Sequence, residues 1–308
     1  MRHILPLISI VFLIVAPACA KKEQVNTPQE ALSHEDNKTA QDIAQQTAEL
    51  SHEDTEENAD DVIQASQPTD STCDGLDFYG QCAKLNGIIT FGSYPQETDT
   101  PEPIEWRVLD MNDEGQILIL SKKVLDVKPY NTTLIDITWE KSTIRSWLNG
   151  YPASYNTDGT DFTRDNFINV AFNAEEQAKI VASTVTADTI PRLDTSPGNA
   201  TTDKIFLLSI AEAQNYFSSD PARDPARRAD ATRYAIQKGV GVVGSKSNEY
   251  TEDGTCTDVH CHAYWWLRSP GFKTVLADVV YSDGSVFFLG NNVDLVNRGV
   301  RPALWVKL

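Results

Sequence analysis

The sequence predicts an α+β fold in which residues 73–308 form one globular head, with antiparallel strands at both ends and helices between them. Three observations support this prediction. Branched apolar segments separated by turn signals lie near both ends of the head, helix-capping patterns lie in its middle, and residues 20–72 before it have a polar composition. The head is long enough to bury a core of its own. A signal segment and a disordered tether are expected to precede it.

Residues 1–19 have the pattern of a secretory signal. Arg2 precedes an apolar stretch from Ile4 to Val15, which is too short for a spanning helix. The Ala18-Cys19 junction resembles the processing site of bacterial lipoproteins, where the cysteine is lipidated. This predicts an exported protein anchored by lipid at the outer membrane or cell surface. In the alternative, ordinary signal peptidase cleaves nearby and releases a soluble secreted or periplasmic protein.

Residues 20–72 are expected to form a disordered acidic tether. They contain no aromatic residue, and thirteen Asp and Glu residues stand against three lysines. Such a segment buries too little apolar surface to offset its ordering entropy. Charge repulsion should extend it, so that it can hold a folded head away from a membrane. A pentapeptide repeated at residues 32–36 and 50–54 is interpreted as duplicated linker.

The first part of the head is predicted to contain three strands and a helix. Gly87 to Tyr94 is rich in branched and aromatic residues and ends before a proline, which favours a strand. Ile104 to Met111 and Gln116 to Ser121 flank an Asn-Asp-Glu-Gly turn and are predicted to pair as a hairpin. A helix is expected over residues 140–148, because Asn149-Gly150 is a favoured C-terminal signal.

The middle of the head is predicted to contain further helices. Asn173 and Ser209 are each followed three residues later by a glutamate, which is the capping-box pattern of a helix start. The short apolar segment 204–208 is predicted as a buried strand. A further helix is expected over residues 225–238, where Gly239 ends it.

The last forty-odd residues predict a closing β-meander. It begins with the tryptophan-rich segment Trp265 to Gly271 and continues with strands over residues 275–281 and 286–289, joined by a tight turn at 282–285. It ends in the Gly-Val-Arg-Pro-Ala-Leu-Trp segment at 299–305. Buried aromatics and rigid Gly and Pro residues in this order indicate a fixed architecture.

The charge of the chain limits its partners. The whole chain has a net charge of −18, and the head keeps −9 of it. An acidic head argues against nucleic acid, whose phosphates need a basic surface, and against anionic lipid headgroups. The expected partner is an extracellular or periplasmic protein or glycan. Contact with a membrane is expected through the lipid anchor alone.

Four cysteines remain when Cys19 is set aside, and they form two close pairs. Cys73 lies near Cys82, and Cys256 lies near Cys261. In an exported chain an even number of cysteines indicates disulfides, so two local bonds are predicted. Loops this short stabilise a fold by roughly 2–3 kcal/mol each when chain entropy is the main effect.

Six short blocks between Gly87 and Leu308 occur in one order and carry a family resemblance. They begin at Phe91, Ile104, Thr143, Lys204, Trp265 and Val300. Together they resemble the bacterial family called domain of unknown function 6273. The closing pattern is also similar to the end of C-type-lectin-like domains, a superfamily that includes the sulfatase-modifying, formylglycine-generating proteins. This second resemblance implies a C-type-lectin-like fold for the head.

The resemblance does not bring the best-known activities of that superfamily with it. The Trp265 block lacks the acids of a calcium-dependent sugar site, and both cysteine pairs lie outside the six blocks. The function expected is therefore a non-catalytic binding domain for a protein or glycan, and no catalytic residue is assigned. The alternative is an exported enzyme related to formylglycine-generating proteins, or a glycan hydrolase.

Contacts to such a ligand are predicted in loops between the central helices and the closing strands. Exposed aromatic and amide side chains suit a binding site, which favours Tyr130, Tyr264, Trp265 and Asn292. Arg268 and Arg301 are further candidates. For both arginines the structural alternative is that they hold loop carbonyls or acids at the closing sheet.

No cofactor is expected, and two metal sites remain as alternatives. Cys256, Cys261, His260 and His262 offer two thiolates and two imidazoles, which suit zinc. If the cysteines are oxidised, the histidines can still bind a metal or respond to pH. The loop at 291–294 offers oxygen atoms that suit calcium, although a turn explains the same residues.

Overall fold

The computed structural model describes residues 85–188, 194–217, 225–252 and 255–308. The chain divides into two units, Met1–Gln64 and Ala65–Leu308, and every described residue belongs to the second. The predicted signal and tether lie outside the described residues, as do Cys19, Cys73 and Cys82. Within the described part of the chain, no helix has the length and apolar character needed to cross a membrane.

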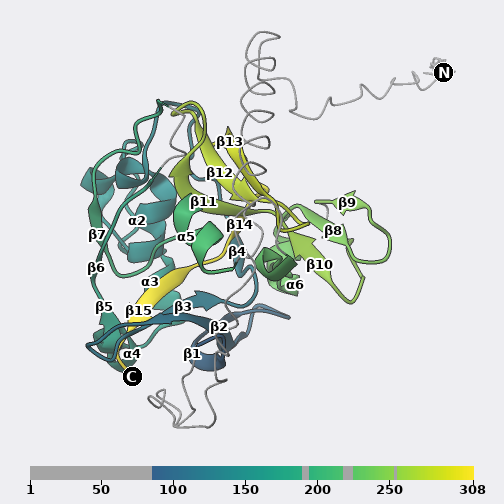
Figure 1. The fold of residues 1–308 in the computed structure, drawn as a ribbon, viewed down its shortest axis with the longest axis horizontal. Helices are drawn as coiled ribbons and strands as arrows, with labels where there is room; N and C mark the ends of the chain where they lie inside the picture. Colours follow the sequence, from purple (N-terminus) through teal and green to yellow (C-terminus); the bar gives the residue numbers. More distant parts are fainter. Residues whose placement is uncertain (1–84, 189–193, 218–224, 253–254) are drawn as a thin grey trace, which may run out of the picture. The chain divides into compact units, whose positions relative to one another are not determined.

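The described part is an α+β structure built mainly of antiparallel strands, as the sequence predicts (Figure 1). One five-stranded sheet has the order β1-β2-β3-β15-β5, and all its neighbours are antiparallel. Its strands are β1 Ile88–Pro95, β2 Pro101–Met111, β3 Ile117–Ser121, β15 Ala303–Val306 and β5 Ile180–Val181. The predicted first strand and hairpin are confirmed. The last strand, β15, lies between β3 of the hairpin and the edge strand β5.

A second five-stranded sheet contains the predicted meander. Its order is β13-β12-β11-β14-β4, in which β11 and β14 run parallel and the other neighbours antiparallel. Its strands are β13 Val286–Asn292, β12 Leu276–Val280, β11 Trp265–Pro270, β14 Gly299–Val300 and β4 Asp126–Val127. The meander β11-β12-β13 is confirmed. The final Ala-Leu-Trp segment leaves it and joins the first sheet.

Two smaller sheets and several short helices complete the described structure. One small sheet has the order β10-β8-β9 and the other pairs β6 with β7. These strands are β8 Val242–Gly244, β9 Tyr250–Thr251, β10 Cys261–Ala263, β6 Ser183–Val185 and β7 Thr201–Asp203. The α-helices are α2 Thr143–Asn149, α3 Phe167–Ala171, α4 Ala174–Lys179, α5 Ile210–Asn215 and α6 Arg233–Gln237. The 3₁₀ turns are η1 Trp139–Lys141, η2 Ala153–Tyr155 and η3 Pro225–Arg227.

Local sequence signals place three of these helices correctly. Both predicted capping boxes are formed: Asn173 starts α4 and Ser209 starts α5, each exchanging hydrogen bonds with the glutamate three residues later. Ser142 caps α2, and Gly150 ends that helix with a φ of 69°, a left-handed conformation that glycine adopts at little cost. The helix therefore begins slightly later than the predicted residue 140, after the separate turn η1.

Two predicted elements are wrong. Residues 204–208 do not form a strand, although Ile205 to Leu208 are buried as expected. The Asn149 side chain makes hydrogen bonds with the backbone of Lys204 and Ile205, in place of the bonds that a neighbouring strand would make. Phe206 forms only an isolated β-bridge with Ala303. The side-chain bonds satisfy the backbone without a sheet.

The predicted helix over residues 225–238 is split into η3 and α6. Between them, Asp230 and Ala231 form isolated bridges with His262 and Val124. Thr232 then caps α6 through its side-chain oxygen. Because these backbone groups find partners on distant segments, the helical pattern of the sequence is interrupted at its centre.

The core is formed by aromatic and aliphatic side chains of both large sheets. Trp106, Trp139, Trp265 and Trp266 are almost completely buried. Trp106, which belongs to the predicted buried face of the hairpin, donates from Nε1 to the Phe91 carbonyl oxygen at 2.6 Å. Three arginines are also among the largest fully buried side chains: Arg227, Arg268 and Arg301.

Asp278 on β12 is a buried carboxyl group that lacks a hydrogen-bond partner among the described residues. Only 1% of the residue is exposed. Burial, helped by the charge of Asp188, raises the pKa of Asp278 well above its usual value. The folded state therefore holds a proton that the unfolded chain releases near pH 4. Stability is retained below that pH and falls as the pH rises toward the raised pKa.

We expect Asp278→Asn to lose this pH dependence. Above about pH 4, the free energy of unfolding of the wild-type head should fall relative to the variant by about 1.4 kcal/mol per pH unit, until the raised pKa is reached. Urea titrations at several pH values measure the difference. Asp113→Asn, at an exposed position in the β2–β3 turn, is the matched control and should follow the wild type. Parallel pH profiles for Asp278→Asn and wild type would contradict the assignment.

Candidate functional site

A surface hollow lies where η1, α2 and η2 meet the start of β7. It has a volume of about 270 Å³. Its walls are formed by Glu140, Lys141, Arg145, Ser154, Tyr155, Ala200 and Thr201. We call this hollow the groove. Its lining is dominated by charged groups, hydroxyls and one phenol ring.

The floor of the groove is fixed by Asp203, whose side chain is completely buried. Its carboxylate accepts four hydrogen bonds, from Arg145 Nε at 2.8 Å, Trp139 Nε1 at 2.9 Å, Thr201 Oγ1 at 2.6 Å and the Tyr151 hydroxyl at 3.1 Å. These donors come from η1, α2, β7 and the segment after α2. A buried carboxylate with this many donors is well satisfied, so it orders the surrounding elements instead of binding a ligand itself.

Arg145 connects this floor to the hollow. Its side chain is 7% exposed, and besides Asp203 it donates from an Nη atom to the Glu140 carbonyl oxygen at 2.7 Å. The guanidinium also lies over the Tyr151 ring, 5.0 Å from its centre. Arg145 is therefore held in one orientation, which is the condition for a rigid hydrogen-bonding wall.

Tyr155 forms an exposed aromatic wall of the groove. The residue is 46% exposed, and its ring packs on Tyr151 with 4.7 Å between the ring centres. On the other side, the Glu140 carboxylate accepts from the Asn199 side chain at 2.9 Å. The groove thus combines a partly exposed ring with hydrogen-bonding groups whose positions are set by their neighbours.

A second hollow of about 200 Å³ shares Lys141 with the groove. Its other walls are Asp136, Ile137, Thr138, Thr157 and Thr274. Although three threonines and one carboxylate belong to it, this lining exposes more apolar than polar surface, unlike the groove. Lys141, an exposed residue, contributes to both neighbouring hollows.

Four of the predicted contact residues lie in the core. Tyr130, Trp265, Arg268 and Arg301 are each at most 1% exposed, so they do not form a surface in this structure. Tyr130 donates to the Arg268 carbonyl oxygen at 2.9 Å and packs near Trp139 of η1. Tyr130 thus supports the segment that carries two groove residues.

The two arginines hold loop backbone, as the structural alternative for them describes. Arg268 donates to the carbonyl oxygens of Thr186 at 2.7 Å and Leu207 at 2.6 Å, and it makes a bidentate pair with Glu212. Arg301 donates to the carbonyl oxygens of Ser121 and Arg227 at 2.9 and 3.1 Å. The guanidinium groups thus supply hydrogen bonds to loop carbonyl oxygens that have no partner in a neighbouring strand.

The other two predicted contacts, Tyr264 and Asn292, are partly buried. Tyr264 belongs to a row of neighbouring rings with Tyr250, Tyr281 and Phe287, whose successive centres lie 5.5, 5.0 and 4.9 Å apart. Arg298 lies over the Tyr264 ring. This row is a second aromatic surface, and Tyr250 is its most exposed ring at 44%.

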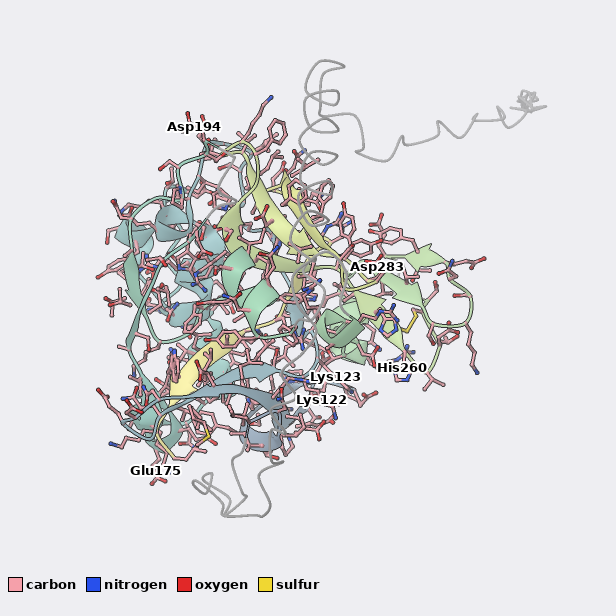
Figure 2. The ribbon with its side chains drawn as sticks, viewed as in Figure 1. Lys122, Lys123, Glu175, Asp194, His260 and Asp283 are labelled. Carbon is pink, nitrogen blue, oxygen red and sulfur yellow. A yellow bond between two sulfur atoms is a disulfide. The ribbon has the colours of Figure 1, made fainter. Side chains whose placement is uncertain are left out.

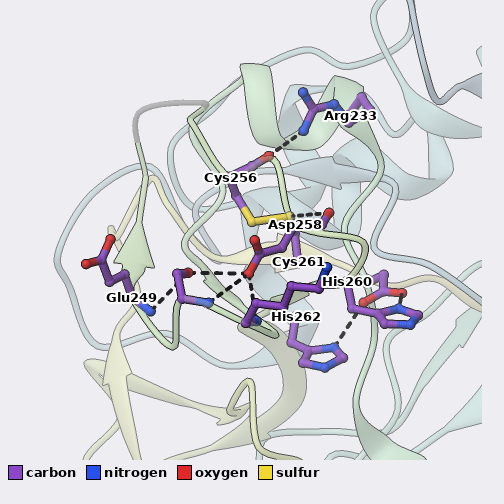
Figure 3. The surroundings of a disulfide bond; sticks show 10 residues. Arg233, Glu249, Cys256, Asp258, His260, Cys261 and His262 are labelled. Atoms are coloured by element: carbon purple, nitrogen blue, oxygen red, sulfur yellow. Dashed lines mark hydrogen bonds and ion pairs between the residues drawn. A yellow bond between two sulfur atoms is a disulfide. The ribbon is translucent and has the colours of Figure 1, made fainter.

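Cys256 and Cys261 form the predicted disulfide (Figure 3). Their sulfur atoms are bonded to each other, so they do not serve as zinc ligands. Within the described part of the chain, no cluster of three or more His, Cys, Asp and Glu side chains is arranged to hold a metal ion. At the predicted calcium loop, the Asn291 side-chain oxygen accepts from Arg298 at 2.8 Å.

His260 and His262 lie beside the disulfide and share one carboxylate. His260 Nδ1 is 2.7 Å from Asp230 Oδ2, and His262 Nδ1 is 3.0 Å from Asp230 Oδ1. Burial lowers the pKa of His262 more than Asp230 raises it. The ring of His262 is thereby kept in its neutral form at pH 7.

Sequence reasoning did not find the groove. Its residues come from three separated segments, 140–145, 154–155 and 200–201, and each has an ordinary polar composition. The one available signal was Arg145, which lies in the Thr143 block of the family resemblance. Arg145 lies among the apolar residues Ile144 and Trp147 of this helix, and an arginine in such a place indicates a buried group of opposite charge.

Comparison with protein families gives one match. The model described as "Domain of unknown function (DUF6273)" matches residues 114–308, which contain the groove, the closing meander and the disulfide. Comparisons with curated proteins and with solved structures return no match.

Removal of the Asp203 carboxylate should destabilise the head strongly. Asp203→Ala leaves the Arg145 charge and three further donors without their acceptor, and such a loss costs about 3–5 kcal/mol. Urea denaturation followed by tryptophan fluorescence measures it. The control is Glu105→Ala, which removes an ion pair with Lys122, and both side chains are about half exposed. Lys122 is labelled at the surface in Figure 2. That control should cost less than about 1 kcal/mol. Equal losses in both variants would rule out the role given to Asp203.

Proposed function

This chain belongs to the family described as domain of unknown function DUF6273, and we propose that it is a non-catalytic binding protein of the cell envelope whose head takes a glycan ligand in the groove. The observation that carries the proposal is the composition of the groove: one exposed ring beside rigidly held hydrogen-bonding groups. Sugars present hydroxyl groups at their edges and apolar C–H groups on their faces, and both match such a lining.

The size and charge of the groove support a glycan of neutral character. A hollow of about 270 Å³ holds one sugar ring, and the hollow beyond Lys141 gives room for a neighbouring ring. Ligand sites usually have a larger apolar share than this one, which disfavours an apolar ligand. Within the groove, Lys141 and Arg145 are balanced by Glu140 and by Asp203 beneath, so no strong preference for an ion is expected.

We also propose that the head has a C-type-lectin-like fold and is lipidated at Cys19. The fold proposal rests on the ordered sequence blocks and on the return of the last strand to the first sheet. The anchoring proposal rests on the Ala18-Cys19 junction after an apolar signal. A bound glycan would then lie at or near the surface of the cell.

Binding at the groove should depend on Tyr155. We expect Tyr155→Ala to weaken binding by about 2 kcal/mol, or roughly 30-fold, because a central aromatic contact is lost. A glycan array identifies the ligand, and calorimetry with that ligand gives the affinities. Since the residue is half exposed, the fold should be retained, as circular dichroism can confirm.

The matched control is Tyr250→Ala, which removes a similarly exposed tyrosine from the aromatic row. Its affinity should equal that of the wild type. If Tyr250→Ala loses the ligand and Tyr155→Ala keeps it, the site is the aromatic row and the groove proposal is wrong. An empty array, combined with capture of an envelope protein by the wild type and not by Tyr155→Ala, would replace the glycan with a protein ligand.

Lipidation should require Cys19. In a bacterial host fed a labelled fatty acid, the wild-type chain should carry the label and sediment with membranes, because acyl chains give stable anchoring. Cys19→Ser should lose the label and appear in the soluble fraction. Cys82→Ser, which changes another cysteine of the same chain, should keep the label. A soluble, unlabelled wild-type protein would instead favour simple secretion.

A further inference from the structure

Two imidazole rings share one carboxylate on the edge of the small sheet β10-β8-β9. His262 is the central residue of β10, and His260 precedes that strand by one residue. Their rings are nearly parallel, with an interplanar angle of 9° and 5.8 Å between the ring centres. Residues two apart in extended chain project to the same face, which accounts for this arrangement. Figure 3 shows both histidines beside the disulfide.

The shared carboxylate determines which ring nitrogen remains for a ligand. Asp230 is contacted by Nδ1 of both histidines, at 2.7 and 3.0 Å. In a neutral imidazole one nitrogen carries the proton and the other a lone pair. The His260 Nδ1 atom is hydrogen-bonded to Asp230, so if it carries the proton its Nε2 presents a lone pair. His262 Nδ1 lies near the same carboxylate without the alignment of a hydrogen bond, and its neutral ring can also leave Nε2 unprotonated. Histidines that bind metals very often have this carboxylate contact on the second nitrogen, because it fixes the ring and raises its basicity.

The surrounding chain holds the pair in place from both sides. Asp230 and His262 are joined by a backbone bridge, and the Ala231 amide donates to the Cys261 carbonyl oxygen at 2.9 Å. The disulfide between Cys256 and Cys261 closes the loop that contains His260. In that loop, the Asp258 carboxylate accepts from the backbone amides of Lys246 and Ser247 at 2.8 and 3.1 Å (Figure 3). The histidines are therefore carried by an anchored loop and a paired strand.

We propose that His260 and His262 bind one late first-row divalent metal ion through their Nε2 atoms, with Asp230 orienting the His260 ring by a hydrogen bond and lying 3.0 Å from the His262 ring nitrogen. Imidazole ligands suit Cu²⁺, Ni²⁺ and Zn²⁺, whereas Ca²⁺ and Mg²⁺ prefer oxygen. Two protein ligands leave the remaining positions to water or to an added donor group. Metal–nitrogen distances of about 2.0–2.1 Å require the two ring tips to converge. The His260 side chain, at 57% exposure, has room to tilt toward its neighbour.

This metal site is independent of the glycan proposal. It lies on β10 and the segment before α6, and none of its residues lines the groove. It also differs from the zinc site considered in the sequence analysis, because that site needed two cysteine ligands and the two sulfur atoms are bonded to each other. Failure of one proposal leaves the other untouched.

Calorimetry of the untagged, oxidised full chain with CuCl₂, NiCl₂, ZnCl₂ and CaCl₂ tests the site, in a His3→Ala background that removes the copper- and nickel-binding Met-Arg-His terminus. We expect one saturable ion per chain, with Cu²⁺ bound more tightly than Ni²⁺ or Zn²⁺ and no binding of Ca²⁺. His260→Ala, a change at an exposed position, should abolish tight binding without altering the melting temperature. Asp230→Asn should weaken binding by about 10- to 100-fold, the usual effect of losing such an orienting partner.

The chain offers a matched control, since His34 and His52 lie in the predicted tether. The double variant His34→Ala/His52→Ala should bind metal as the wild type does. Proton NMR gives a second readout, because Cu²⁺ should broaden the ring signals of His260 and His262 before those of the other histidines. Loss of binding in the tether variant, unchanged binding in His260→Ala, or no binding by the wild type would each overturn the proposal.

Discussion

The fold depends on buried arginine side chains that hold loop carbonyls between the two large sheets. Arg301 follows β14 and donates to Ser121 at the end of β3 and to Arg227 at the end of η3, while its guanidinium lies 4.9 Å from the centre of the Trp265 ring. One side chain thereby joins strands of both sheets and a distant turn. A planar group with five donors suits this task, because it satisfies several backbone oxygens in fixed directions.

Arg268 extends the same principle to the central segments. Its donors reach the carbonyl oxygens of Thr186 and Leu207 and the Glu212 carboxylate, so β11 is tied to the start of α5. Glu212 is also the capping-box acid of that helix. Irregular backbone in the middle of the head can be buried only because such donors are present. Replacement by lysine would keep a charge but not the planar set of bonds.

The parts of the fold that the sequence predicts are those determined by neighbouring residues. The hairpin turn, both capping boxes and the glycine that ends α2 act within a few residues, and all were placed from sequence. The segment around Phe206 and the interruption at Asp230 depend on Asn149, Ala303 and His262, which are distant in the chain. No local pattern carries that information, because tertiary partners override the propensity of the segment.

The candidate sites show the same limit. Tyr130 and Trp265 are aromatic residues near predicted loops, but composition does not reveal which side of the chain faces solvent, and both are buried. The groove requires three segments to meet around Asp203, so it appears only in three dimensions. The histidine pair was visible in the sequence, whereas its shared Asp230 was not.

The two proposed sites differ in their local charge, and this difference suits them to different classes of ligand. The chain has a net charge of −18, so its field concentrates cations near the surface and repels anions. In the groove, the charges of Arg145 and Lys141 are opposed by nearby carboxylates, and hydrogen-bonding groups rather than a net field must select the ligand. At His260 and His262 the Asp230 carboxylate, 2.7 and 3.0 Å from the two ring nitrogens, instead supplies a negative charge that favours a divalent cation. The two proposals are therefore compatible on one acidic domain, because hydrogen bonding would select a neutral sugar in the groove and the histidine pair with its carboxylate would select a metal ion.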